Sequence, residues 1–241
     1  MKVKATISYN GTKFYGSQVQ ENKITVNGTL QEVLKSMGVE SKLEASGRTD
    51  RGVHATGQVV DFEIPEFWKD TKKLLETMNS KLPPSIQVRR IEIAGDDFHA
   101  RYGASRRVYR YLLKEGRSNP FEDEFVTFVD QLNIEVLREA AKLFEGTHDF
   151  KEFHKRGSDN KTTVRTIYKT SVYRHKGVTV LYFEANGFLR SQIRLMVAML
   201  LGINEGRFSL EDLKNRLECK KKTALKPAPS NGLYLAKIFY S

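Results

Sequence analysis

The sequence predicts an α+β fold built from two units that carry strands and helices in a similar order. Segments in which apolar and polar residues alternate, as in strands, are interleaved with segments of helical spacing. This pattern restarts after Ala100, and 241 residues are enough for one large domain or two small ones. We therefore expect an N-terminal half over residues 1–100 and a C-terminal half over residues 101–241, whose sheets join into one.

The first half is expected to begin with a strand, because Val3, Ala5 and Ile7 alternate with polar residues. Leu30 and Leu34 lie four residues apart, which is typical of the buried face of a helix. The remaining elements predicted for this half are a strand over 58–64, a helix over 72–79 that ends before Pro83, and a strand over 86–93.

The second half is expected to begin with a strand over 108–113. Asn133 is a typical N-cap and precedes apolar residues at helical spacing up to Phe144. The later elements predicted are two strands over 165–173 and 178–185, helices over 188–201 and 210–217, and a strand over 233–239.

Composition and charge narrow the functional class. The net charge of +11 favours a polyanionic partner, since lysine and arginine release counterions when they bind phosphates. No apolar run is long enough to span a membrane, and we expect a cytoplasmic protein. The single cysteine, Cys219, excludes an internal disulfide and a cysteine-based zinc site. Basic residues gather in two stretches: Arg101, Arg106, Arg107, Arg110, Lys114 and Arg117, and then Lys220, Lys221, Lys222 and Lys226.

The most informative stretch is GRTDRGVHA, residues 47–55. It places a carboxylate, Asp50, between Arg48 and Arg51, with glycines on both sides. Glycine lets the backbone turn tightly and approach a ligand, and neighbouring cations keep an aspartate ionised. Taken alone, Asp50 is either a salt-bridged turn residue or a catalytic carboxylate.

This stretch resembles the catalytic loop of the TruA family of tRNA pseudouridine synthases, with Asp50 in the position of the essential aspartate. Four further segments resemble the family in the same order: FHAR at 98–101, RVYRY at 107–111, NGFLRSQIR at 186–194 and APSNGLYL at 228–235. The resemblance implies two ferredoxin-like (RRM-like) halves that share one mainly antiparallel sheet, with an active-site cleft between them. It also implies a homodimer that isomerises uridine to pseudouridine at positions 38 to 40 of the tRNA anticodon stem-loop.

The family's catalytic residues map onto Asp50, Tyr109 and Arg194. An aspartate can attack the sugar C1′ or assist the departure of the base, and the sequence leaves both routes open. The ring of Tyr109 can stack on uracil and its hydroxyl can move a proton. By its place in the motif, Arg194 is expected to pair with Asp50, since a partly buried arginine requires a carboxylate.

The resemblance also implies a set of RNA contacts. Arg48 is expected to help flip the target base out of the stack. His54 is a candidate base, although a hydrogen bond that orders the loop is the stronger interpretation. The full set of expected RNA-binding residues is Arg48, His54, Arg101, Arg107, Arg110 and Arg190. Two positions depart from the family: Ser17 stands where tryptophan is common, and Arg51 where a small residue is common.

Two other classes of protein would each require features of their own. A non-catalytic RNA-binding protein would need paired aromatic residues in RRM-type motifs, and the sequence has none. A carboxylate-dependent hydrolase would need a second catalytic carboxylate or a metal cluster, and the strand pattern accounts for Asp61 and Glu63. The histidines lack the spacing of metal ligands, so we expect no metal. The sequence lacks a phosphate-binding loop of the required spacing, so we expect no nucleotide cofactor.

Overall fold

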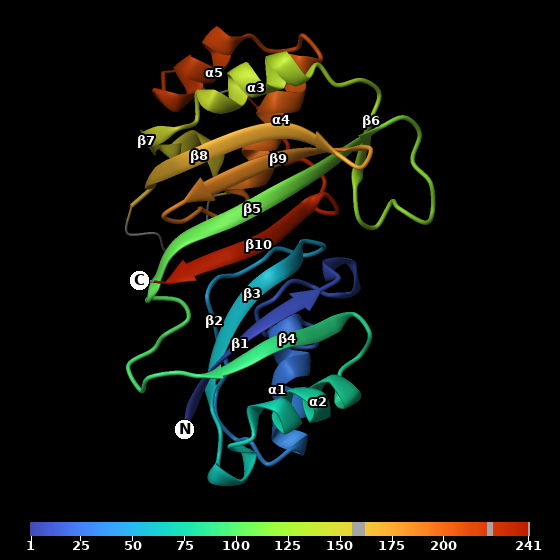
Figure 1. Cartoon of the computed structure of the whole chain (residues 1–241). Helices are drawn as coiled ribbons and strands as arrows, with labels where there is room; N and C mark the ends of the chain where they lie inside the picture. The colour runs from blue at the N-terminus through green and yellow to red at the C-terminus, as the bar shows by residue number, and fades with distance from the viewer. Residues whose placement is uncertain (156–161, 221–223, 241) are drawn as a thin grey trace. The chain divides into compact units, whose positions relative to one another are not determined.

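A computed structural model describes residues 1–155, 162–220 and 224–240 (Figure 1). The chain divides into two compact units. The first comprises Met1–Ser105 together with the chain from Tyr234 onward, and the second comprises Arg106–Leu233. Both units contain helices and mainly antiparallel strands, which confirms the predicted α+β class. The shared sheet, the cleft and the boundary between halves at residue 100 stay predictions.

The first unit contains four strands and two α-helices before its chain leaves for the second unit. In chain order they are β1 (Lys2–Tyr9), α1 (Val26–Ser36), β2 (Glu44–Ala45), β3 (His54–Glu63), α2 (Thr71–Lys81) and β4 (Ile86–Ile93), with short 3-10 helices at Gly11–Lys13 and Glu66–Trp68. Both helices begin at side-chain caps. Thr25 accepts a hydrogen bond from the Gly28 amide, and Asp70 accepts from the amides of Lys72 and Lys73.

The sheet of the first unit has β1 at its centre. β1 pairs antiparallel with β4 on one side and with β3 on the other, so that Val3 lies opposite both Ile93 and Phe62. Alternate residues of β1 are buried, as the sequence pattern predicts. The far edge of β3 pairs with β2 and, in parallel, with β10 (Leu233–Tyr240), where Tyr234 lies opposite His54. The chain order βαββαβ of this unit is that of a ferredoxin-like unit.

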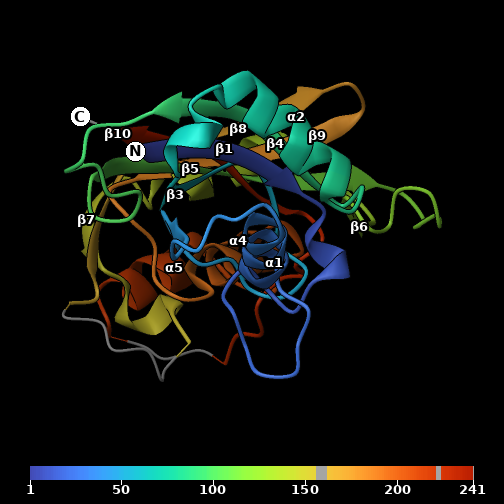
Figure 2. The same ribbon diagram turned by 90° about the horizontal axis from the view of Figure 1, so that it is seen from below.

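The second unit is richer in helices. In chain order it contains β5 (Ala104–Glu115), which starts at the end of the first unit, β6 (Thr127–Val129), α3 (Ile134–Lys142), β7 (Gly146–Asp149), a 3-10 helix at Phe150–Phe153, β8 (Val164–His175), β9 (Val178–Ala185), α4 (Gln192–Asn204) and α5 (Leu210–Leu217). Its sheet runs β5-β9-β8-β7, all antiparallel, with β6 parallel to β5. Helices α4 and α5 of this unit are labelled in the view from below in Figure 2.

Helix α4 forms the core of the second unit. Between Gln192 and Ile203, Arg194 is the one residue that is not buried. A helix that is apolar on all sides needs packing on all sides, and α4 packs against α3 and the 3-10 helix at Phe150–Phe153.

Of the part of the chain that the structure describes, no helix is long and apolar enough to cross a membrane.

Helix α4 begins four residues later than predicted. The expected start at residue 188 is wrong, because Ser191 has a left-handed backbone with φ of 59° and α4 begins at Gln192. Arg190 therefore lies outside the helix. The four-residue spacing of Arg190 and Arg194 therefore does not place the two side chains on one helix face.

Candidate active site

The segment that carries Asp50 lies between β2 and β3 and is ordered by a buried glutamine. The Gln58 side chain, fully buried on β3, accepts a hydrogen bond from the Ser46 hydroxyl at 2.6 Å and donates to the Gly47 carbonyl at 2.9 Å. At the other end, the Val53 amide donates to the Asp50 carbonyl at 3.1 Å, and Gly52 supplies a positive φ of 78°. Asp50 thus occupies the first position of a tight turn, and it is half-buried.

Thr49 anchors the backbone immediately before Asp50. Its hydroxyl pairs with the Tyr9 hydroxyl at 2.8 Å. Its amide donates to the Ser17 hydroxyl at 2.8 Å, and its carbonyl accepts from the Ser17 amide at 3.1 Å. All three residues are buried. Because buried hydrogen bonds are costly to break, these contacts restrict the position from which the Asp50 carboxylate projects.

His54 lies at the start of β3 and is only 1% exposed. Its Nδ1 accepts a hydrogen bond from the Gly11 amide at 3.1 Å, which places the ring proton of a neutral imidazole on Nε2. The ring stacks on Tyr234 with centroids 4.5 Å apart. This burial favours the role of ordering the loop over a direct contact with RNA.

The two other residues of the first unit predicted to bind RNA are exposed. Arg48 lies two residues before Asp50, on the same segment. Arg101 lies over the ring of Tyr102, with its guanidinium carbon 5.5 Å from the ring centroid, and Tyr102 is itself 77% exposed. Both arginines are therefore accessible to a ligand in solution.

Tyr109 lies on β5 in the second unit, where its backbone is opposite Phe183 of β9. The side chain is 9% exposed, and its ring meets the edge of Phe188 with centroids 5.3 Å apart. A regular strand and an aromatic neighbour fix the direction of this ring. The residue is thus held at the border between core and surface.

The neighbouring residues on β5 have different environments. Arg107 donates to the Asn186 carbonyl at 3.0 Å. Burial, and to a smaller extent the positive charge of Arg107, lowers the pKa of Arg165. Arg110 is exposed. Tyr111 is fully buried, and burial raises the pKa of its hydroxyl, which bonds to Thr127 and to the Pro229 carbonyl.

Arg194 is held against the segment that follows α5. Its Nε donates to the Ala228 carbonyl at 2.6 Å, while the Ala228 amide donates to the Arg194 carbonyl at 2.9 Å. The side chain is half-buried, and its planar guanidinium has further donors besides Nε. Arg190 is exposed, and its carbonyl accepts from the Lys155 amide at 3.0 Å.

The predicted catalytic residues belong to both units. Asp50, with Arg48, His54 and Arg101, lies on the first unit, and Tyr109 and Arg194, with Arg107, Arg110 and Arg190, lie on the second. The pairing of Arg194 with Asp50 stays a prediction. Sequence reasoning did not find the anchors of the Asp50 segment, namely Tyr9, Ser17 and Gln58. The position of Ser17, at a departure from the family pattern, was the one available signal.

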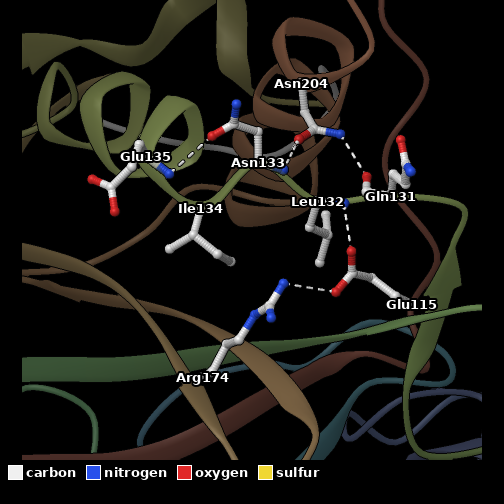
Figure 3. A pocket seen from close by; sticks show the side chains of 8 residues that line it. All are labelled: Glu115, Gln131, Leu132, Asn133, Ile134, Glu135, Arg174 and Asn204. Atoms are coloured by element: carbon white, nitrogen blue, oxygen red, sulfur yellow. Dashed lines mark hydrogen bonds and ion pairs between the residues drawn. The ribbon is translucent and has the colours of Figure 1, made fainter.

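A cavity of about 660 Å³ in the second unit is lined by none of these residues (Figure 3). Glu115 lines the cavity and accepts hydrogen bonds from the Leu132 amide and from Arg174. Asn204 accepts a hydrogen bond from the Asn133 amide and donates one to the Gln131 carbonyl. These groups satisfy one another, so the cavity is a polar junction between β5, β8, α3 and α4. The described residues contain no group of three or more histidine, cysteine, aspartate or glutamate side chains placed to bind a metal.

Comparison with known proteins identifies the family of this chain. A family model described as tRNA pseudouridine synthase matches residues 5–103 and 140–241. The tRNA pseudouridine synthase A of Wolinella succinogenes is 44% identical over 236 residues, covering 98% of this chain and 93% of the relative. That of Campylobacter jejuni (strain RM1221) is 39% identical over the whole of both chains, and that of Helicobacter hepaticus is 37% identical over 98% of each.

The α+β fold and the match to this family define an isomerase that acts on uridine in tRNA. The chain belongs to the tRNA pseudouridine synthase family. The family membership predicted from the sequence is thereby confirmed.

Proposed function

We propose that this protein isomerises uridine to pseudouridine in tRNA, at positions 38 to 40 of the anticodon stem-loop. The observation that supports this most strongly is Asp50 itself, which lies on a turn whose flanking residues, Thr49 and Gly47, are tied to buried side chains. Such anchoring suits a carboxylate that must meet one sugar carbon in one orientation. The family relationship supports the same reaction.

The reaction is an intramolecular transfer and needs no redox change. The N1–C1′ bond of uridine breaks, the base turns, and a C5–C1′ bond forms while C5 loses its proton and N1 gains one. In our proposal the Asp50 carboxylate acts at C1′, either as the attacking group or by stabilising the sugar as the base departs. The Tyr109 ring packs against the base, and its hydroxyl takes part in the proton transfer at C5.

The remaining predicted residues bind and shape the RNA in this proposal. Arg194 pairs with Asp50, and the exposed Arg48 enters the space left by the flipped base. Arg101, Arg107, Arg110 and Arg190 contact phosphates.

The setting is inferred from the substrate and from the family. A tRNA-modifying enzyme of this type acts in the cytoplasm, and we propose that the protein functions as a homodimer. No step of the proposed reaction calls for a metal or a nucleotide cofactor.

The experiment that tests the function uses an unmodified tRNA transcript labelled with tritium at C5 of uridine. Formation of the C5–C1′ bond releases that tritium to water, and chemical mapping of pseudouridine then identifies the position. We expect release from transcripts with uridine at positions 38 to 40 and none when these are replaced by cytidine. Tight binding of tRNA without tritium release would identify a non-catalytic RNA-binding protein and contradict the proposal.

A further inference from the structure

The segment between β1 and α1 forms a closed loop beside the Asp50 segment. The Tyr15 amide donates to the Ile24 carbonyl at 2.9 Å, and the Gln20 side chain donates to the Tyr15 carbonyl at 2.7 Å. A left-handed Asn22, with φ of 56°, turns the chain between Gln20 and Lys23. These bonds order residues 15–24 in the absence of a ligand.

The same loop is joined to the backbone that presents Asp50. Ser17 makes two hydrogen bonds with Thr49, as described above, and Gly16 approaches the Thr49 carbonyl closely. A side chain on Gly16 would start 2.9 Å from that carbonyl oxygen, and the φ of 98° at this position is strained for any residue with a side chain. The loop and the Asp50 segment are therefore held against each other.

Two cations from these two segments meet on one aromatic ring. The Lys23 ammonium lies 4.7 Å from the centroid of the Tyr15 ring, and the Arg51 guanidinium carbon lies 4.5 Å from it. Tyr15 is 41% exposed, and both cations are exposed. We call these three side chains the Tyr15 cluster. Contacts of this kind order long cationic side chains that would otherwise sample many rotamers.

The Tyr15 cluster carries two positive charges that no carboxylate balances. Among the ion pairs of residues 1–155, 162–220 and 224–240, none includes Lys23 or Arg51. Elsewhere on the surface of the same unit, lysines pair with neighbouring glutamates, as Lys4 does with Glu92. A cluster that only stabilised the fold would gain from such a partner, whereas a cluster that binds an anion would not.

We propose that the Tyr15 cluster binds backbone phosphates of the substrate RNA next to the target uridine, an inference that rests on the proposed function. A guanidinium stacked on a ring keeps the N–H groups at its edge, which bind a phosphate in bidentate geometry. Arg51 directly follows Asp50 in the chain, so the phosphate it binds belongs to a nucleotide close to the one that reacts. Arg51 and the loop anchored through Ser17 thus act together in holding the RNA at these positions.

The test measures tRNA binding and turnover in the double variant Lys23→Gln and Arg51→Gln. Affinity for an unmodified tRNA transcript is measured between about 50 and 200 mM KCl, and each lost phosphate contact lowers the slope of log affinity against log salt by about 0.7 to 0.9. We expect the slope to fall by about 1.4 to 1.8, and KM to rise about tenfold at physiological salt with kcat almost unchanged.

Two further variants separate charge from position. Tyr15→Leu keeps both cations but removes the ring, and we expect about a threefold rise in KM with the salt slope unchanged. Lys73→Gln, at an exposed position on α2, is the matched control and should behave like the unaltered protein. Thermal unfolding of each variant verifies that the fold is retained, and the single variants Lys23→Gln and Arg51→Gln repeat the test with less disturbance.

An unchanged slope and KM in the double variant would overturn the inference, provided that the unaltered protein releases tritium. A loss of kcat with an unchanged slope would also overturn it, because the cations would then act on the Asp50 segment and not on RNA. Absence of tritium release by the unaltered protein would contradict the proposed function itself.

Discussion

In the first unit Asp50 lies on an irregular segment, whereas in the second unit Tyr109 and Arg194 lie on a strand and a helix. The irregular segment depends on side-chain hydrogen bonds from Tyr9 and Ser17 to hold its backbone. The strand and the helix obtain their geometry from regular backbone pairing and buried apolar contacts. Polar substitutions near Asp50 should therefore change catalysis, while comparable substitutions around Tyr109 should change stability.

The largest effect is expected from Asp50→Asn. The amide keeps the size and most of the hydrogen bonding of the carboxylate but removes its charge. Pseudouridine formation should fall by at least about 10⁴-fold, while tRNA binding persists. Tritium release in a single turnover, with saturating protein, measures the chemical step. Appreciable turnover by this variant would remove Asp50 from the catalytic role.

The next largest effect is expected from Tyr109→Phe, which keeps the ring and its contact with Phe188 but deletes the hydroxyl. If the hydroxyl takes part in proton transfer at C5, the rate should fall by about 10² to 10⁴-fold with little change in affinity. Single-turnover rates and tRNA binding are to be compared at the same pH. A variant with a normal rate would mean that Tyr109 only packs or stacks.

An intermediate effect is expected from Thr49→Val, which removes the hydroxyl that Tyr9 contacts and preserves the shape. Looser positioning of Asp50 should lower kcat about tenfold with tRNA affinity unchanged. Tyr9→Phe removes the other half of the same hydrogen bond. The double variant should be no slower than the worse single variant, and additive losses would show that the bond does not hold the segment.

The smallest effect on catalysis is expected from Tyr111→Phe in the second unit. The buried hydroxyl bonds to Thr127 and donates to the Pro229 carbonyl, so its loss removes a partner of each group and should lower the free energy of unfolding by about 1 to 3 kcal/mol. The rate at a temperature well below unfolding should stay unchanged. A marked loss of kcat in this variant would erase the proposed difference between the two units.

The sequence predicted the elements whose pattern is local. The strand at residues 86–93 and the helix at 210–217 have the bounds expected from their apolar periodicity and turns. The Asn133 cap was also correct, with its side chain accepting hydrogen bonds from the amides of Glu135 and Val136. Such signals depend on residues close together in the chain.

The parts that were missed depend on distant contacts. Strands β2 and β6 have two and three residues, too few to show a period, and they exist because they pair with β3 and β5. The predicted start of α4 was wrong because the left-handed backbone of Ser191 has no signature in the residues around it. In the candidate site, the motif identified Asp50, but its anchor Tyr9 lies 40 residues away from Thr49 in the chain. The roles assigned to the site residues stay predictions.

The pairing of β10 with β3 has a consequence for the order in which the protein is made. Tyr234, which stacks on His54, leaves the ribosome only after the entire second unit has been translated. Until then the edge of β3 at His54 and Ala55 is uncovered, and a bare strand edge is a site for incorrect pairing between nascent chains. The His54 ring, which orders the loop next to Asp50, gains its stacking partner Tyr234 last. In the proposed mechanism, activity therefore arises late in synthesis, even though Asp50 is encoded in the first quarter of the message.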